Sequence, residues 1–178
     1  MSLKNKKRYL ENLYLLYIFF TTSLIGGLLE SFYVWFRFGH FNIGGFLYGP
    51  WRPIYGVGCL ILYFITEILK KRQKSDLFIF GICASVCTIF EYISSWLLEV
   101  IFKRTWWNYE GDFLSINGRV SLFTTIAWGF LGLFFLKYLE PNIRKSFEKF
   151  SLVEISFITF LLIALFFMDY VYSFINYI

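Results

Sequence analysis

The sequence predicts an all-α, polytopic membrane helical bundle of about five transmembrane helices. Of its 178 residues, 58% are hydrophobic and 24% aromatic, and the mean hydropathy is +0.60. A soluble domain of this size buries less apolar side chain than that. Several apolar stretches approach the 20 residues that a helix needs to cross a hydrocarbon core about 30 Å thick. These stretches lack the period-2 alternation of barrel strands, so helices are the fitting spanning structure.

Five spans are predicted within a single integral membrane domain that covers residues 1–178. The first span follows a basic cluster, as a signal peptide would, but it is too long for one and no small-residue cleavage site follows it. We therefore expect it to remain as the first membrane helix. The predicted spans are residues 11–36, 54–69, 77–102, 120–137 and 152–177.

Small and polar residues recur at helical spacing in three of these spans. Small residues let helices approach closely, and polar residues at membrane depth avoid lipid. We therefore expect the first, third and fourth spans to pack together around their acidic residues. The stripes are Thr22, Gly26 and Glu30 in the first span, Thr88, Glu91, Ser95 and Glu99 in the third, and Thr125, Gly129 and Gly132 in the fourth.

The distribution of Lys and Arg predicts an N-in, C-out orientation. With the N-terminus in the cytoplasm, 12 of the 17 basic residues lie on the inner side, as the positive-inside rule requires. They form short clusters between apolar spans, which indicates topology determinants and no nucleic-acid partner. The Phe- and Ile-rich, Lys-biased composition is typical of a bacterial protein, so we expect a multi-pass protein of the cell membrane.

The two predicted outer loops show a similar order of residues. Glu30 and Trp35 in the first span have the same spacing as Glu91 and Trp96 in the third. Each pair is followed by Phe-Leu, a glycine, an arginine and a return span. A tandem duplication of a helical hairpin, completed by a fifth helix, is therefore a hypothesis for this chain.

Four acids, Glu30, Glu91, Glu99 and Asp169, are predicted in the outer half of their spans. A charge at this depth costs roughly 2.5–3.5 kcal/mol, so such residues usually face a bundle interior or a wet cavity. We expect the four to converge. Two interpretations stay open: outer arginines neutralise the acids and hold the bundle together, or the acids line an outward-facing pocket that binds a cation or polar head group, or exchanges protons.

The loops near residues 37–53 and 103–119 carry the other candidate residues. The segment GPWRPIYG, residues 49–56, cannot be regular helix throughout, so it is either a wall of the pocket or a rigid start of the second span. The second loop is either a platform that stacks on a ligand or an aromatic anchor in the interface. The predicted pocket residues are Glu30, Arg52, Tyr55, Glu91, Glu99, Trp107, Tyr109, Asn117, Arg119 and Trp128.

The sequence offers little for cofactor or metal chemistry. His40 is the only histidine, and the three cysteines lie within apolar stretches as small hydrophobic residues do. There is no phosphate-binding loop, nucleophile elbow or H-E-x-x-H motif. We expect no cofactor and no metal site, and an enzymatic role, although open, is not favoured.

Several short segments, taken together, resemble one family. They are GPWRPIYGVG (49–58), EYISSWLLE (91–99), TWWNY (105–109), INGRVSL (116–122) and AWG (127–129). Over roughly residues 25–135 the chain resembles the Putative ABC-transporter type IV family of integral membrane proteins. The resemblance implies a multi-helix membrane subunit of a transporter. Arg52 and Asn108 depart from it, because members commonly have a small residue or cysteine at the first position and aspartate at the second.

The expected function is a transporter-type or substrate-binding membrane subunit with an outward-facing acidic and aromatic pocket. The predicted cytoplasmic loops are too short to fold as a nucleotide-binding domain, so ATP-driven transport would require a separate ATPase or other membrane subunits. The expected partners also include the lipid bilayer and further copies of the chain. Two alternatives are an outer-leaflet membrane enzyme acting on lipid or envelope substrates, with paired glutamates as acid and base, and a non-catalytic membrane assembly or sensor protein.

Overall fold

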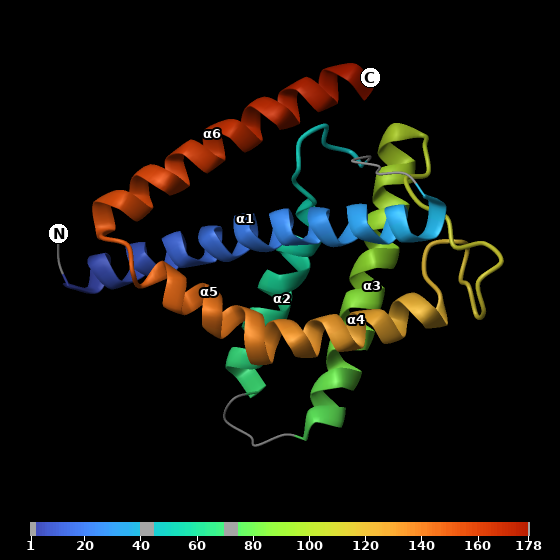
Figure 1. Cartoon of the computed structure of the whole chain (residues 1–178), viewed down its shortest axis with the longest axis horizontal. Coiled ribbons are helices and arrows are strands. Elements are labelled where there is room, and N and C mark those ends of the chain that lie inside the picture. Colours follow the sequence, from blue (N-terminus) through green and yellow to red (C-terminus); the bar gives the residue numbers. More distant parts are fainter. Residues whose placement is uncertain (1–2, 40–44, 70–74, 178) are drawn as a thin grey trace. The chain divides into compact units, whose positions relative to one another are not determined.

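The computed structural model describes residues 3–39, 45–69 and 75–177, which are predominantly helical (Figure 1). Among these residues no β-strand is present, and the one isolated bridge joins Ile116 to Val120. The elements are α1 (Leu3–Phe38), α2 (Pro53–Leu69), α3 (Asp76–Phe102), α4 (Leu122–Phe134), the π-helix η1 (Phe135–Leu139), α5 (Glu140–Phe147) and α6 (Leu152–Tyr177). The prediction of an all-α protein is confirmed.

Four helical segments are long and apolar enough to cross a membrane. They are α1, α3, the continuous run of α4, η1 and α5, and α6. The second helix, α2, has 17 residues, about 26 Å at 1.5 Å per residue, which is at the lower end of membrane-spanning lengths. The structure is consistent with a helical membrane bundle in which α2 is the short member.

Two helices extend beyond the spans that hydropathy predicts. The first begins at Leu3, eight residues before the apolar stretch, because Lys, Asn and Arg in its first turns are compatible with helix. The fourth span continues past Lys137 to Phe147 through the widened π turn of η1. Hydropathy marks where a helix leaves lipid, whereas hydrogen bonding and packing decide where it ends.

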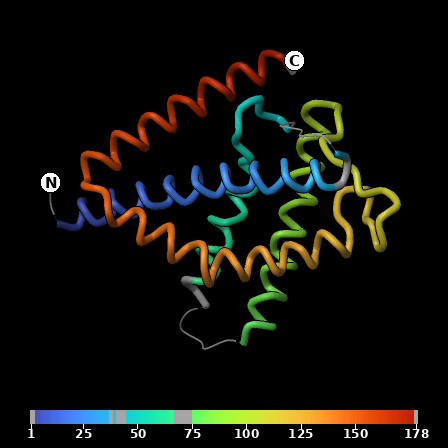
Figure 2. Tube along the Cα trace, in the orientation of Figure 1, coloured from blue at the N-terminus to red at the C-terminus, as the bar shows by residue number. Residues whose placement is uncertain are grey.

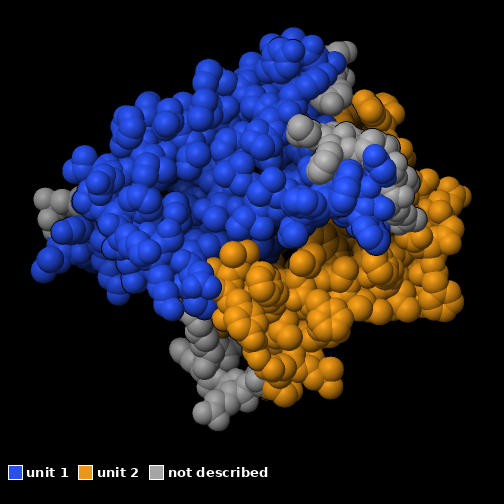
Figure 3. Space-filling view, in the orientation of Figure 1, with its two compact units in different colours: residues 1–60, 140–178 blue, residues 61–139 orange. Residues whose placement is uncertain are grey.

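The chain divides into two compact units, coloured separately in Figure 3. Unit 1 comprises Met1–Leu60 and Glu140–Ile178, and unit 2 comprises Ile61–Leu139. Unit 1 therefore joins the two ends of the sequence, and unit 2 is built from its middle. Each unit is described separately below.

In unit 1, α6 diverges from α1 toward the C-terminus, and the segment 45–52 lies between the two helices in that region (Figure 2). The core here is aromatic. Trp51 lies edge-on to Phe20, with ring centroids 5.6 Å apart, and both rings contact Phe166 of α6. In lipid, van der Waals packing of such large rings stabilises the contact, so the 45–52 segment is held by the same core that joins α1 to α6.

A buried polar cluster attaches α5 to α1. The Tyr14 hydroxyl donates to Oε1 of Glu140 over 2.7 Å, and Arg144 donates to the same oxygen over 2.8 Å. The Arg144 guanidinium also lies 4.4 Å from the centroid of the Tyr14 ring. These contacts, with buried Ile143, explain why the helix continues beyond the apolar part of the span.

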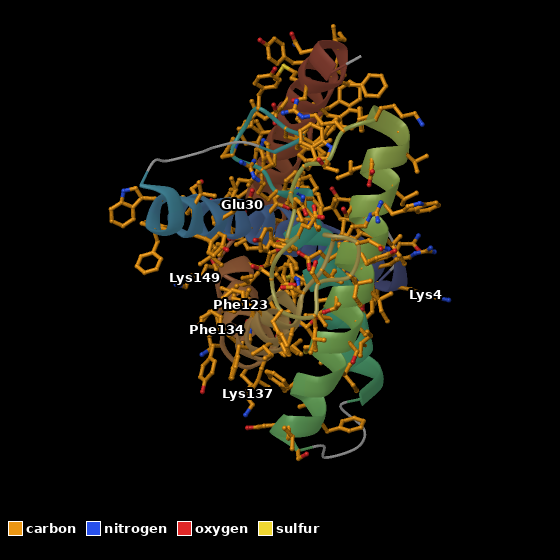
Figure 4. All side chains as sticks on the ribbon, turned by 90° about the vertical axis from the view of Figure 1, so that its right-hand side faces the viewer. Lys4, Glu30, Phe123, Phe134, Lys137 and Lys149 are labelled. Carbon is orange, nitrogen blue, oxygen red and sulfur yellow. The ribbon has the colours of Figure 1, made fainter. Side chains whose placement is uncertain are left out.

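In unit 2, α3 packs along α4 at small residues. A Cβ at Gly129 would lie 2.5 Å from the Phe80 ring, and one at Gly132 would lie 2.5 Å from Cβ of Cys83. The close approach predicted for these two glycines is therefore confirmed. Figure 4 shows Phe123 and Phe134 on the side of α4 turned away from α3, where both are exposed and available to lipid.

Candidate functional site

The ten residues predicted to line a pocket are divided between the two units. Glu30, Arg52 and Tyr55 belong to unit 1. The other seven belong to unit 2: Glu91, Glu99, Trp107, Tyr109, Asn117, Arg119 and Trp128. Within each unit the residues form defined contacts, and the convergence of all ten on one pocket stays a prediction.

In unit 1, Arg52 fixes the segment before α2 onto α1. Its side chain is buried, and Nη1 donates to the carbonyl oxygens of Gly49 (3.2 Å) and Trp51 (2.8 Å). Its Nε lies 3.3 Å from Oε2 of Glu30, and its backbone N–H donates to the carbonyl of Ser23 over 3.1 Å. Every one of these contacts is within the fold, so Arg52 has a structural role and neutralises Glu30.

Glycines of α1 allow this segment to lie unusually close to the helix. A Cβ on Gly26 would lie 2.2 Å from Cγ of Tyr55, and one on Gly27 would lie 2.3 Å from the carbonyl oxygen of Pro50. Both distances are far below van der Waals contact, so only glycine fits at either position. The Tyr55 side chain therefore packs against α1.

Asp169 of α6 binds the backbone of the same segment from the opposite side. Its Oδ1 accepts the N–H of Gly49 over 2.9 Å, while the N–H of Tyr48 donates to the hydroxyl of fully buried Ser173 over 3.1 Å. Sequence analysis identified Asp169 as an acid at membrane depth but missed this partner. The two groups are 120 residues apart in the chain, and side-chain capping of a loop N–H leaves no local sequence signal.

In unit 2, Glu91 of α3 is the central polar residue. It is 4% exposed, and its two carboxylate oxygens accept from the Tyr109 hydroxyl (3.1 Å) and from Nε1 of Trp128 (2.8 Å). The structure therefore brings together three of the predicted residues, from α3, from the loop 103–121 and from α4. Within the described part of the chain, both of these donors are neutral and Glu91 has no ion-pair partner.

The same loop makes further contacts with α3. Arg119 forms an ion pair with Glu99, and its guanidinium lies 5.5 Å from the centroid of the Tyr92 ring. Nδ2 of Asn117 donates to the Tyr92 hydroxyl over 2.8 Å, and Nε1 of Trp107 donates to the carbonyl of Arg119 over 3.1 Å. The loop therefore lies against the polar stripe of α3 through specific side chains, and the Glu99 charge is neutralised there.

Left-handed backbone at Asn117 and Gly118 shapes this loop. Their φ angles are 53° and 68°, an arrangement that Asn-Gly adopts readily in tight turns. Beside the turn, the N–H of Tyr109 donates to the carbonyl of Gly118 over 2.7 Å. A Cβ on Gly118 would lie 2.3 Å from Oδ1 of Asn108, which itself accepts the N–H of Glu110. The turn therefore sets the position of Tyr109 opposite Glu91.

We expect Gly118→Ala to destabilise the docked loop by about 1–2 kcal/mol, because alanine disfavours this φ and its Cβ would displace Asn108. Hydrogen exchange at the Tyr109 amide should increase. Gly111→Ala is the matched control, since Gly111 also has a positive φ, 95°, but its Cβ would meet nothing within 4 Å. Equal exchange in the two variants would contradict the predicted contact with Asn108.

Neutral donors around a buried carboxylate permit two kinds of chemistry. Glu91 can accept a hydrogen bond from a cationic group in place of Tyr109 or Trp128, or it can hold a proton. Among the described residues, no cluster of three or more His, Cys, Asp or Glu side chains could hold a metal ion. His40 and the side chains of Arg37 and Glu67 lie outside the described residues.

The long apolar helices and their internal polar clusters define a helical membrane protein. The Putative ABC-transporter type IV family matches residues 17–174, so the chain belongs to this family. The match extends beyond the resemblance seen in the sequence and includes all but the last three residues of α6. No curated protein and no solved structure matches the chain.

Proposed function

We propose that the protein is a transporter-type or substrate-binding membrane subunit, and that Glu91 is the group that binds its substrate. The observation that carries this proposal is the environment of Glu91, a buried acid on a membrane-length helix that accepts only from neutral donors among the described residues. Acids at membrane depth are costly to maintain and commonly mark transport pathways. Membership of the family agrees with this function.

The chemistry of the site favours a substrate with a cationic, hydrogen-bond-donating group. A carboxylate attracts such a group, and the rings of Tyr109 and Trp128 beside it supply aromatic faces that stabilise cations. The substrate would displace at least one neutral donor from Glu91. Because Tyr109 belongs to the loop 103–121, substrate binding and loop position would be coupled.

The proposed orientation is N-in and C-out, which places the loop 103–121 on the outer side of a bacterial cell membrane. ATP-driven transport would require a separate ATPase, and an oligomer or additional subunits would complete the translocation path. Within unit 1, Glu30, Arg52 and Tyr55 have a structural role in this proposal, because they hold the start of α2 against α1.

A non-catalytic assembly or sensor protein is the second candidate, because other acids are ion-paired. Glu30 pairs with Arg52, and Glu99 pairs with Arg119. Such pairs hold elements together without leaving a charge for a ligand. The Glu91→Gln substitution distinguishes the two candidate functions. It keeps the shape of the side chain, which an assembly protein needs, and removes the negative charge, which a transporter needs.

The test is uptake of a fluorescent organic cation, ethidium, into vesicles that contain the protein purified together with its co-purifying subunits, with and without ATP. We expect uptake to depend on ATP and to fall about tenfold or more in Glu91→Gln, corresponding to at least ~1.4 kcal/mol of lost binding. Glu148→Gln is the matched control, because Glu148 is exposed.

Direct binding distinguishes the outcomes. Ethidium fluorescence titrated with the detergent-solubilised protein should show saturable binding that Glu91→Gln weakens and Glu148→Gln preserves. Uptake and binding that are unchanged in Glu91→Gln would remove this acid from the mechanism. The assembly candidate would be favoured if the wild-type protein binds no ethidium and the Glu91→Gln protein folds normally and retains its subunit contacts.

A further inference from the structure

A basic turn begins α1. Four of the five residues from Lys4 to Arg8 are Lys or Arg, and all five are exposed. Because α1 begins at Leu3, helical backbone holds these charges in fixed register. Glu11, the first acid in the sequence, follows one turn later. The turn is therefore a compact, strongly positive surface.

A contact with α6 indicates how deep this turn lies relative to the apolar part of unit 1. The hydroxyls of Tyr9 and Ser156 are 3.0 Å apart, which places Tyr9 level with the second turn of α6. At 1.5 Å per residue, Lys4 lies about 7.5 Å beyond Tyr9, close to the level at which α6 begins. The polar interface of a bilayer extends roughly 5–8 Å beyond each side of the hydrocarbon core.

The side chains of α6 locate the hydrocarbon boundary at the same place. From its second turn onward α6 exposes an apolar stripe at helical spacing, formed by Phe157, Phe160 and Leu161, which are 66%, 69% and 47% exposed. Lipid tails are the solvent that suits this stripe. The basic turn of α1 therefore lies at head-group level when the stripe of α6 lies in the hydrocarbon.

The four basic residues of this turn outnumber the exposed acids next to it, Glu11 of α1 and Glu154 of α6. Glu154 accepts the N–H of Ser151 over 2.8 Å and so caps the start of α6. Glu140 is paired with Arg144 inside the unit. Lys149 projects on the other side of unit 1 from Lys4 (Figure 4), so the positive charge is present on both sides of this end.

We propose that the basic turn Lys4–Arg8 binds the phosphate of an anionic phospholipid of the phosphatidylglycerol class. Lysine ammonium groups are compact donors that suit a phosphate, and juxtamembrane basic clusters attract anionic lipids. The bound lipid would fix the first turn of α1 beside α6. This site is separate from Glu91 and does not depend on the proposed transport function.

The experiment follows thermal unfolding of the full chain in a neutral detergent while phosphatidylglycerol or phosphatidylcholine is added. We expect phosphatidylglycerol to raise Tm and phosphatidylcholine to leave it nearly unchanged. The variant Lys4→Gln/Lys6→Gln/Lys7→Gln should need at least about fivefold more phosphatidylglycerol for the half-maximal rise, since the loss of even one basic residue near an anionic surface costs about that factor. The corresponding triple Lys→Arg variant should retain the wild-type response.

Lys103→Gln/Arg104→Gln is the control, because these two exposed basic residues belong to unit 2, and it should keep the wild-type response. Circular dichroism checks that each variant keeps its helices. An unchanged phosphatidylglycerol response in the triple Gln variant, or an equal response to phosphatidylcholine, would overturn the proposal. An equal rise with soluble glycerol phosphate at the same concentration would also overturn it, by identifying a general anion site.

Discussion

Glu30→Ala is expected to lower the free energy of unfolding by about 3 kcal/mol, because it leaves the Arg52 guanidinium buried without its carboxylate. Arg52 is only 5% exposed, whereas the Glu30 side chain is 33% exposed, so water that enters the vacated position offsets only part of the lost interaction. Two backbone carbonyls would still accept from the guanidinium, but neither carries a full negative charge. Denaturant unfolding followed by tryptophan fluorescence in micelles measures the change.

The design of this experiment separates the ion pair from general effects of losing an acid. Glu148→Ala removes an exposed acid of the same unit and should change stability by less than about 0.5 kcal/mol. A double-mutant cycle with Arg52→Met measures the coupling energy between Glu30 and Arg52. A Glu30→Ala protein as stable as the wild type, or a coupling energy near zero, would show that the pair contributes nothing to stability.

Gly27→Ala is the second substitution with a large expected effect, and we expect it to destabilise unit 1 by about 1–3 kcal/mol. The new Cβ would lie 2.3 Å from the carbonyl oxygen of Pro50. That oxygen belongs to backbone held by Arg52 and Asp169, so it cannot move without disturbing the segment. The same thermal and denaturant measurements apply.

Gly81→Ala in α3 is the matched control for this prediction, and its expected change has the opposite sign. A Cβ on Gly81 would meet nothing within 4 Å, so helix propensity alone predicts stabilisation by roughly 0.5–1 kcal/mol. The contrast tests whether close approach, and not the loss of glycine as such, determines the outcome at Gly27. Stabilisation by both substitutions would contradict the packing of Pro50 against α1.

The sequence alone predicted part of the Glu91 cluster. Helical spacing placed Glu91 and Glu99 on one stripe of α3, and both now contact residues of the 103–121 loop. The particular partners could not be predicted, because sequence spacing alone does not show which of the acids forms an ion pair with Arg119. The turn at Asn117 and Gly118 decides the matter by placing Tyr109 at Glu91 and Arg119 at Glu99.

The helical structure of η1 and α5 could not be predicted from the sequence. The charged residues from Lys137 to Lys149 indicate a connection outside the membrane, and hydropathy cannot distinguish a polar loop from a polar helix. Burial of Glu140 against Tyr14 and Arg144 keeps this segment helical. The hydrogen bond from Tyr14 to Glu140 joins residues 126 positions apart, so no local sequence pattern predicts it.

The sequence by itself determined that lipid surrounds the protein and that its secondary structure is helical. Long apolar stretches require helices, because lipid offers no hydrogen bonds to the backbone, and this constraint acts on each segment independently. Tertiary structure alone decided which polar groups meet. Arg52 neutralises Glu30, and Asp169 accepts the N–H of Gly49. Among the residues that the structure describes, Glu91 accepts only from neutral donors. Those pairings depend on distances between elements remote in the chain, and they separate the acids that hold the fold from the one proposed to bind substrate.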